Sequence, residues 1–209
     1  MMTTLAILLG LGGRGTTMTT MAILLGLGAA SSVAWPSSCP DYEAVSTPEA
    51  QHLDPDIYVQ GFWYEIYSAN VFLTKGCQCT RYNMTRTSPT TFSDVFTCHK
   101  DAPNGSVTTL PNHGSFAAEQ PGKMDESLGP VSPPYWVLKT YNATPATYDA
   151  ALVYACVGAA GFTSEYVYLF SREPTLPSAI EADMRAHLHQ HNISQDAILA
   201  VPMAGCDWM

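Results

Sequence analysis

The segment Gly61-Phe62-Trp63-Tyr64-Glu65-Ile66, together with Arg172 far later in the chain, decides the fold. A tryptophan early in the first strand of a β-barrel can close the floor of the barrel. An arginine from the last strand can then stack on the indole ring through a cation–π contact. Gly61, Trp63 and Arg172 are therefore expected to form the floor of one closed container.

Short aromatic and β-branched runs follow this segment and are separated by Gly, Pro, Asn and Ser. This pattern predicts an all-β chain whose eight strands form an up-and-down antiparallel barrel, a size that holds one small ligand. The expected strands lie at 62–72, 77–86, 91–99, 106–110 with 114–119, 122–127, 134–141, 150–157 and 165–171.

One helix is predicted over residues 178–191, because Ser178 and Glu181 form a capping box after Pro177. Its residues Ile180, Met184 and Leu188 recur at intervals of four and give one apolar stripe, which we expect to pack on the outside of the barrel. A brief strand near 197–201 is expected to return to the barrel edge. The barrel domain is placed at 61–205, after an N-terminal arm at 35–60.

The beginning of the chain contains a duplicated leader. Residues 2–13 recur almost unchanged as residues 18–29, and the second apolar stretch ends in the small-x-small pattern Ser32-Val33-Ala34. We interpret residues 1–34 as a secretory signal peptide that is removed after Ala34. A membrane anchor is the alternative, but the apolar run is shorter than the ~20 residues that a spanning helix needs.

The composition favours an oxidising compartment and excludes nucleic acid as a partner. Only 13% of the residues are charged, with 18 acids against 9 bases and a net charge of −9. Six cysteines and four glycosylation sequons all follow the proposed cleavage site, so secretion is predicted, with an endomembrane lumen or an algal plastid as the alternative. The sequons begin at Asn83, Asn104, Asn142 and Asn192.

Four ordered segments carry a family resemblance. Gly61-Phe62-Trp63 resembles the glycine-x-tryptophan motif that opens lipocalins, and Tyr168–Pro177 resembles the last-strand segment of the apolipoprotein D-like and bacterial outer-membrane lipocalins. The segments Pro134–Leu138 and Ala151–Cys156 match the same subfamily, and the resemblance runs from about Cys39 to Cys206. It implies a lipocalin barrel that binds and transports a small lipophilic molecule.

The resemblance also implies two disulfides, Cys39 with Cys156 and Cys77 with Cys206. Cys79 and Cys98 are extra relative to the family pattern. They lie symmetrically about the Ser88-Pro89 turn, so a regular hairpin would bring them opposite each other. A third disulfide, Cys79 with Cys98, is therefore expected. A reactive thiol at Cys79 is the functional alternative.

The expected ligand site lies on the aromatic face of the last strand. If Arg172 points inward, alternation places Tyr166, Tyr168 and Phe170 on the same side. Tyr82 and Met84 in the second strand complete the expected set. Such a surface suits a lipophilic ligand with a few polar groups: a fatty acid, sterol, retinoid or carotenoid. The alternative is that these aromatics only fill a barrel too small for a ligand.

Catalytic, metal and cofactor sites are not predicted. The chain has neither a GxSxG elbow nor an HExxH motif. Glu65 is the acid that alternation places on the Trp63 side, where a buried carboxylate could be catalytic. His187 and His191 share a helix face, a spacing that can hold a metal ion, but they lack a third ligand.

The preferred interpretation is a carrier rather than an enzyme. Lipocalin-like barrels include de-epoxidases, so an enzyme acting on a bound lipid or carotenoid, of de-epoxidase or isomerase type, is the second hypothesis. A protein-interaction module is the third, and a peripheral contact with membranes or lipoproteins stays open.

Overall fold

The computed structural model of this chain describes residues 39–69, 74–127, 132–142, 144, 146–159 and 162–207, with the backbone alone at 159 and 162. The predicted leader at 1–34 and its cleavage site at Ala34 lie outside the described residues. So do the first residues of the arm.

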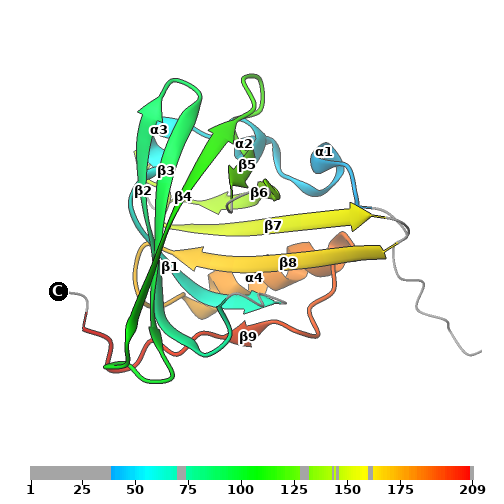
Figure 1. Ribbon diagram of the computed structural model, residues 1–209. Coiled ribbons are helices and arrows are strands. Elements are labelled where there is room, and N and C mark those ends of the chain that lie inside the picture. The colour runs from blue at the N-terminus through cyan, green and yellow to red at the C-terminus, as the bar shows by residue number, and fades with distance from the viewer. Residues whose placement is uncertain are drawn as a thin grey trace, which may run out of the picture. The chain divides into compact units, whose positions relative to one another are not determined.

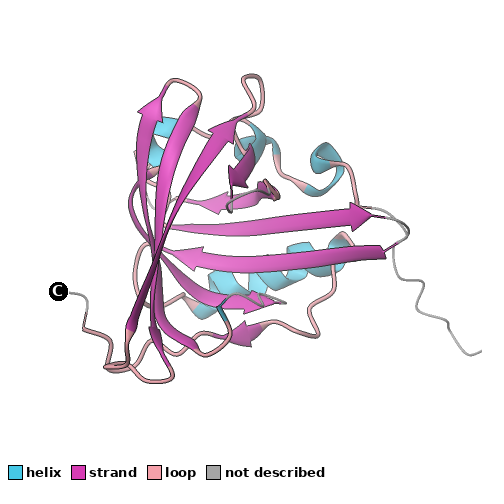
Figure 2. Cartoon of the chain, viewed as in Figure 1, coloured by secondary structure: helices cyan, strands magenta, loops and turns pink. Residues whose placement is uncertain are grey.

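Eight antiparallel strands close into one barrel, as expected (Figures 1 and 2). Each strand pairs with the next along the chain, and β1 closes the barrel by pairing with both β8 and β2. The region predicted as two pieces at 106–110 and 114–119 is one continuous strand, β4. The strands are β1 (Gln60–Ala69), β2 (Cys77–Ser88), β3 (Thr91–Lys100), β4 (Val107–Phe116), β5 (Lys123–Ser127), β6 (Pro134–Tyr141), β7 (Ala150–Ala159) and β8 (Phe162–Ser171).

The N-terminal arm folds into three single-turn helices that the sequence analysis did not predict: α1 (Tyr42–Val45), α2 (Pro48–Gln51) and α3 (Pro55–Tyr58). Proline occupies the first position of α2 and α3, where its missing N–H costs nothing. The side chains of Thr47 and Asp54 accept backbone N–H groups at the starts of these two turns. Each turn is too short to produce an apolar period, so pattern reading gave no helix signal here.

The apolar residues form two layers. One layer fills the inside of the barrel and centres on Trp63 and Phe170. The other lies outside β6, β7 and β8, where α4 (Ser178–Gln190) packs as its apolar stripe predicted. Met184 and Leu188 are fully buried in this outer layer, against Leu152 and Val167 among others. Val167 therefore faces out from β8, as alternation requires.

The predicted capping box at the start of α4 is wrong. Pro177 is the N-cap residue, and no side chain caps the helix. Glu181 instead accepts hydrogen bonds from the hydroxyl of Tyr67 (2.8 Å) and from Nε of Arg185 (2.8 Å). The Glu181 carboxylate thus fixes the helix to the outside of β1 rather than to its own first turn.

Arg172 and Trp63 form the floor in the expected geometry. The guanidinium carbon lies 3.7 Å from the centre of the indole ring, and Trp63 is fully buried. The indole N–H donates to the carbonyl of Tyr58 (3.0 Å), which also accepts from Nη2 of Arg172 (2.9 Å). One carbonyl of the arm therefore joins both partners of the cation–π pair.

The remaining donors of Arg172 reach other main-chain carbonyls. Nη1 donates to Gln60 (2.6 Å) and Phe62 (2.9 Å), on either side of Gly61. Gly61 has a left-handed backbone (φ 68°), a conformation that costs glycine little and other residues more. Nη2 also reaches Ile57, and Nε reaches Tyr148. All five N–H groups of the guanidinium are used on the floor.

The C-terminal tail completes the wall of the barrel. Strands β1 and β2 pair only from Gln60 to Tyr64, and beyond this point β1 pairs with β9 (Leu199–Ala200) instead. The Val201 N–H donates to Ile66 of β1, and the Cys79 N–H of β2 donates to Pro202, each at 2.9 Å. The tail therefore bridges the two strands where they separate, and the strand expected near 197–201 is present in shorter form.

Three disulfides use all six cysteines. The predicted bridge between Cys39 and Cys156 is present and ties the arm to β7. The other two predicted pairings, Cys77 with Cys206 and Cys79 with Cys98, are wrong. The structure joins Cys77 to Cys98 and Cys79 to Cys206.

A bulge in β2 explains the exchange. Gln78 faces His99 and Arg81 faces Thr97, so Cys79 and Thr80 together oppose the single residue Cys98. Cys79 sits in the bulge with a left-handed backbone (φ 54°), and its side chain bonds to the tail. Cys77 then shares the inner face with Cys98. A regular hairpin, which the prediction assumed, has no such extra residue.

We expect Trp63→Ala and Arg172→Ala to destabilise the barrel by about 3–5 kcal/mol each, because each leaves a buried partner without its stacked neighbour. Urea unfolding measures the change. Arg81→Ala is the matched control, since Arg81 stacks on the half-exposed Phe62 at 4.6 Å and should cost about 1 kcal/mol or less. Equal effects of all three substitutions would contradict the special role of the floor.

Peptide mapping without reduction is expected to recover Cys77 linked to Cys98 and Cys79 linked to Cys206. Cys206→Ser should free the thiol of Cys79 alone, because the bridge between Cys77 and Cys98 does not involve the tail. Labelling after unfolding, followed by mapping, identifies the free thiol. A label on Cys77 in this variant would refute the pairing.

Candidate functional site

The residues predicted to line a ligand site do lie on the inner face of the barrel, but they differ in how tightly they pack. Phe170 and Met84 are fully buried in the inner apolar layer, and Tyr82 is nearly so. Tyr168 is only partly buried, and its ring stacks on that of Phe170 with centroids 5.6 Å apart. Tyr166 is also partly buried. The closed half of the barrel is thus filled by aromatic packing, and Tyr168 marks the boundary of the filled part.

A pocket of about 630 Å³ lies at the seam between β1 and β2. Its inner wall includes Glu65 and Ser68 of β1 with Cys77 and Thr80 of β2, and its outer wall is the tail between 196 and 202. The pocket exists because β1 and β2 separate here and the tail bridges only part of the gap. It connects the tail to side chains on the inner face of the barrel.

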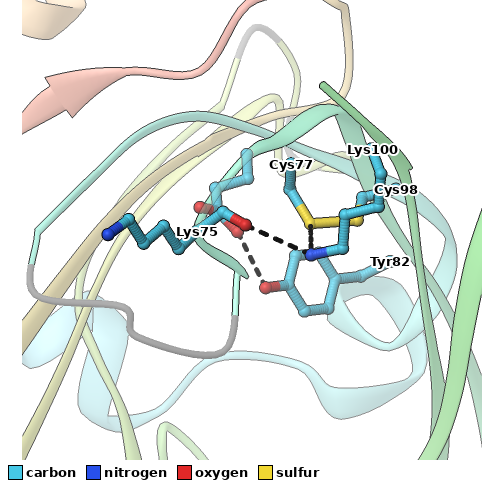
Figure 3. The surroundings of a disulfide bond; sticks show 6 residues. Lys75, Cys77, Tyr82, Cys98 and Lys100 are labelled. Atoms are coloured by element: carbon cyan, nitrogen blue, oxygen red, sulfur yellow. Dashed lines mark hydrogen bonds between the residues drawn. A yellow bond between two sulfur atoms is a disulfide. The ribbon is translucent and has the colours of Figure 1, made fainter. Parts of the chain in front are cut away.

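The Cys77–Cys98 bridge lies beside this pocket. Figure 3 shows it next to the ring of Tyr82 and the side chain of Lys100. The Lys100 ammonium donates to the carbonyl of Lys75 (3.2 Å) and lies 3.4 Å from Sγ of Cys77. The Lys100 ammonium therefore already has partners at the rim of this pocket.

Glu65 is buried on the inner face, where alternation placed it. The hydroxyl of Tyr82 donates to Oε2 of Glu65 (2.8 Å), and the side chain of Ser68 is a second hydrogen-bond partner. Burial raises the pKa of Glu65 above its ordinary value, since no positive charge compensates for the lost hydration. The pairing of β1 with β8 also shifts register between Glu65 and Tyr67, so Glu65 lies at an irregular point of the strand.

A pair of buried acids lies on β3 and β5. Asp94 is fully buried, and neither of its carboxyl oxygens receives a hydrogen bond from the described groups. Its polar neighbour is the carboxyl of Glu126, which accepts from Nδ2 of Asn112 at 3.4 Å. Burial raises the pKa of Asp94 well above its ordinary value, and the neighbouring Glu126 adds to the shift. Two carboxyls can share this space only when a proton lies between them.

The sequence analysis missed Asp94 and Glu126, although a signal for Asp94 was present. In β3 the residues Phe92, Asp94, Phe96 and Cys98 alternate with polar neighbours, and all four are buried. Alternation applied to this strand would have placed Asp94 inside. For Glu126 the signal was weaker, because β5 is only five residues long and Met124 alone marks its inner face.

The histidine pair on α4 has a structural role. His187 is buried and donates from Nε2 to the carbonyl of Val45 in α1 (2.7 Å), and its ring lies 4.6 Å from that of His191. Burial lowers the pKa of His187. Across the described residues, no group of three or more His, Cys, Asp or Glu side chains could hold a metal ion.

Two further observations concern the surface. The four sequon asparagines, Asn83, Asn104, Asn142 and Asn192, are all exposed. Among the helices of the described part of the chain, none combines the length and the hydrophobicity needed to cross a membrane.

Comparisons with known proteins agree with this fold. The family model described as a lipocalin-like domain matches residues 56–202. No curated protein sequence matches the chain. Solved structures do match, at identities that show the fold alone.

Insecticyanin from the tobacco hornworm Manduca sexta is 18% identical, with 82% of this chain and 89% of that chain covered and a TM-score of 0.62. H1 crustacyanin from the lobster Homarus americanus is 17% identical, with 80% and 94% covered and a TM-score of 0.59. The siderocalin Ex-FABP, described as functioning through dual ligand specificities, is 15% identical, with 71% and 95% covered and a TM-score of 0.52.

The buried acids predict how stability depends on pH. A carboxyl whose pKa is raised on folding contributes stability that is fully present below its unfolded pKa of about 4 and is lost as the pH rises through the folded pKa. The substitution Asp94→Asn removes the ionisable carboxyl, so the variant does not lose this stability as the pH rises. We therefore expect the unfolding free energy of the variant, relative to the unmodified protein, to increase by at least about 1 kcal/mol from about pH 4.5 to about pH 8.

Urea unfolding at several pH values measures this difference. The matched control is Asp125→Asn, because Asp125 is exposed on the opposite face of β5 from Glu126. Its difference from the unmodified protein should not change with pH. A pH-independent effect of Asp94→Asn would show that Asp94 is ionised in the folded protein.

Proposed function

Because the chain belongs to the lipocalin family, we propose that it binds a small lipophilic ligand inside its barrel and carries it without chemical change. The observation that carries this proposal is the pocket of about 630 Å³ at the seam between β1 and β2, whose wall includes inner-face residues. That volume is within the range of small-molecule sites in proteins. An aromatic surface at Tyr168 and Phe170 lies on the same inner face.

The packing inside the barrel supports a ligand held beyond Phe170. Five aromatic rings meet in the closed half, so that half is filled by the protein itself: Trp63, Tyr82, Tyr135, Tyr168 and Phe170. A ligand that entered would rest its apolar part on the exposed side of this stack. Burial of that apolar surface supplies affinity at roughly 25 cal/mol per Å², reduced by the cost of association.

The similar siderocalin Ex-FABP supports this proposal, since its function is described in terms of ligand specificities. We also propose that the mature protein is extracellular, or lies in an equally oxidising lumen. Its three disulfides and its four exposed sequon asparagines support this location.

An enzyme acting on a bound lipid or carotenoid is the second candidate. The observation that favours it is the buried pair of Asp94 and Glu126, which retains a proton inside an apolar barrel. Chemical analysis of a lipid or carotenoid recovered after prolonged incubation separates the two functions. A carrier returns the ligand unchanged, whereas an enzyme returns a product.

The carrier proposal predicts that Tyr168→Glu nearly abolishes binding of a neutral fluorescent lipophile such as N-phenyl-1-naphthylamine. The substitution buries an unpaired carboxylate against the ligand, which costs several kcal/mol. Fluorescence titration gives the affinity, corrected for the folded fraction. Thr109→Glu is the control, because Thr109 is exposed on β4 and the same charge there stays outside. Equal losses at both positions would argue that the aromatics are only filler.

A further inference from the structure

The ionisable groups inside the barrel are unevenly divided between acids and bases. Three carboxyls are buried on the inner face: Glu65, Asp94 and Glu126. The hydroxyl of Tyr82 donates to Glu65 and the amide of Asn112 donates to Glu126, and the side chain of Ser68 is a further partner of Glu65. The hydroxyl of Thr80 is buried without a partner, and the neighbour of Asp94 is the carboxyl of Glu126. The three buried carboxyls therefore have only uncharged or acidic groups as these neighbours.

No basic side chain of the described chain corrects this imbalance. Arg172 uses all five of its N–H groups on main-chain carbonyls of the floor. Lys100 is occupied at the rim by Lys75 and Cys77. Among the described residues, the ion pairs all lie elsewhere and none includes the three buried carboxyls.

Two of these acids lie near the expected ligand contact. The hydroxyl of Tyr168 is within electrostatic range of both Glu65 and Glu126. Tyr82 is likewise close to both. The pocket at the seam reaches this region through Glu65 and the unpartnered Thr80. We call Glu65, Asp94 and Glu126 the acidic belt.

We propose that the acidic belt selects a lipophilic cation, a ligand whose apolar chain rests on the aromatic stack and whose protonated amine lies between Glu65 and Glu126. An ammonium group brings up to three N–H donors and the positive charge that the interior lacks. Hydrogen bonds between ammonium and carboxylate are charge-assisted and are roughly twice as strong as neutral ones. A fatty acid carboxylate, in contrast, would add a fourth acceptor and a like charge.

This proposal rests on the proposed function, since it requires a ligand inside the barrel. Three probes with the same twelve-carbon chain separate the two ideas: dodecylamine, dodecanol and dodecanoate. Each is titrated by displacement of N-phenyl-1-naphthylamine. We expect dodecylamine to bind at least about tenfold more tightly than dodecanol, and dodecanoate to bind most weakly.

The variant Glu65→Gln with Glu126→Gln tests whether the belt is responsible. Glutamine keeps the size of each side chain and removes two buried carboxyls. We expect this variant to lose the preference for the amine while its affinity for dodecanol stays within about threefold. Asp125→Asn with Glu119→Gln is the matched control, because both residues are exposed and the same net charge is removed. The control should keep the preference.

Several results would overturn the proposal. If dodecanol binds but dodecylamine binds no better, the belt does not select a cation, although the carrier function stands. A preference that survives in the belt variant, or disappears equally in the control, would assign it to surface charge. If none of the probes binds, the carrier function itself fails.

Discussion

The interaction on which the rest of the structure depends is the contact of Arg172 with the floor. Its guanidinium covers Trp63 and donates every N–H group to main-chain carbonyls of the arm, of β1 and of the loop before β7. Burial lowers the pKa of Arg172 to about 10, so the group stays charged at neutral pH. A buried charge of this kind is tolerated only when it is fully hydrogen-bonded, and main-chain carbonyls meet that need without a carboxylate. The first and last strands are thereby joined to the arm at a single side chain.

The parts of the fold and of the candidate site that could be predicted are those whose sequence signal lies within a few consecutive residues. The motif around Trp63, the alternation in β8 and the apolar stripe of α4 are each contained in a few consecutive residues, and they gave the barrel and its outer helix correctly. The exchange of partners between Cys77 and Cys79 depends on one extra residue in β2, which turns Cys79 toward the tail. A bulge changes the face of a residue without changing the composition around it, so hairpin symmetry could not reveal it. The single-turn helices of the arm escaped for another reason, since each is too short to produce an apolar period.

The inside of the barrel combines two features with opposite effects on stability, aromatic packing and buried acids. Aromatic packing around Phe170 stabilises the closed half, whereas Glu65, Asp94 and Glu126 place acceptors in a volume that water does not freely fill. Buried acids without positive partners reduce stability in the free protein. Such a cost is tolerated most readily where the groups act on a bound molecule, because functional sites are where polar groups retain incomplete partners. The candidate site of this protein is therefore the part of the barrel that packs least well.

The tail that bridges β1 and β2 has a consequence for the order of events during synthesis. Its residues 199–206 are made after the strands that they join. Cys77 and Cys98 can meet as soon as one hairpin has formed, because only 21 positions separate them. Cys79 lies only two positions from Cys77, but 127 positions separate it from Cys206, so it stays a thiol until the tail has been made. During that interval Cys79 and Cys77 compete for Cys98, so the bulge that turns Cys79 away from the hairpin also protects the nascent chain from oxidising to the wrong isomer.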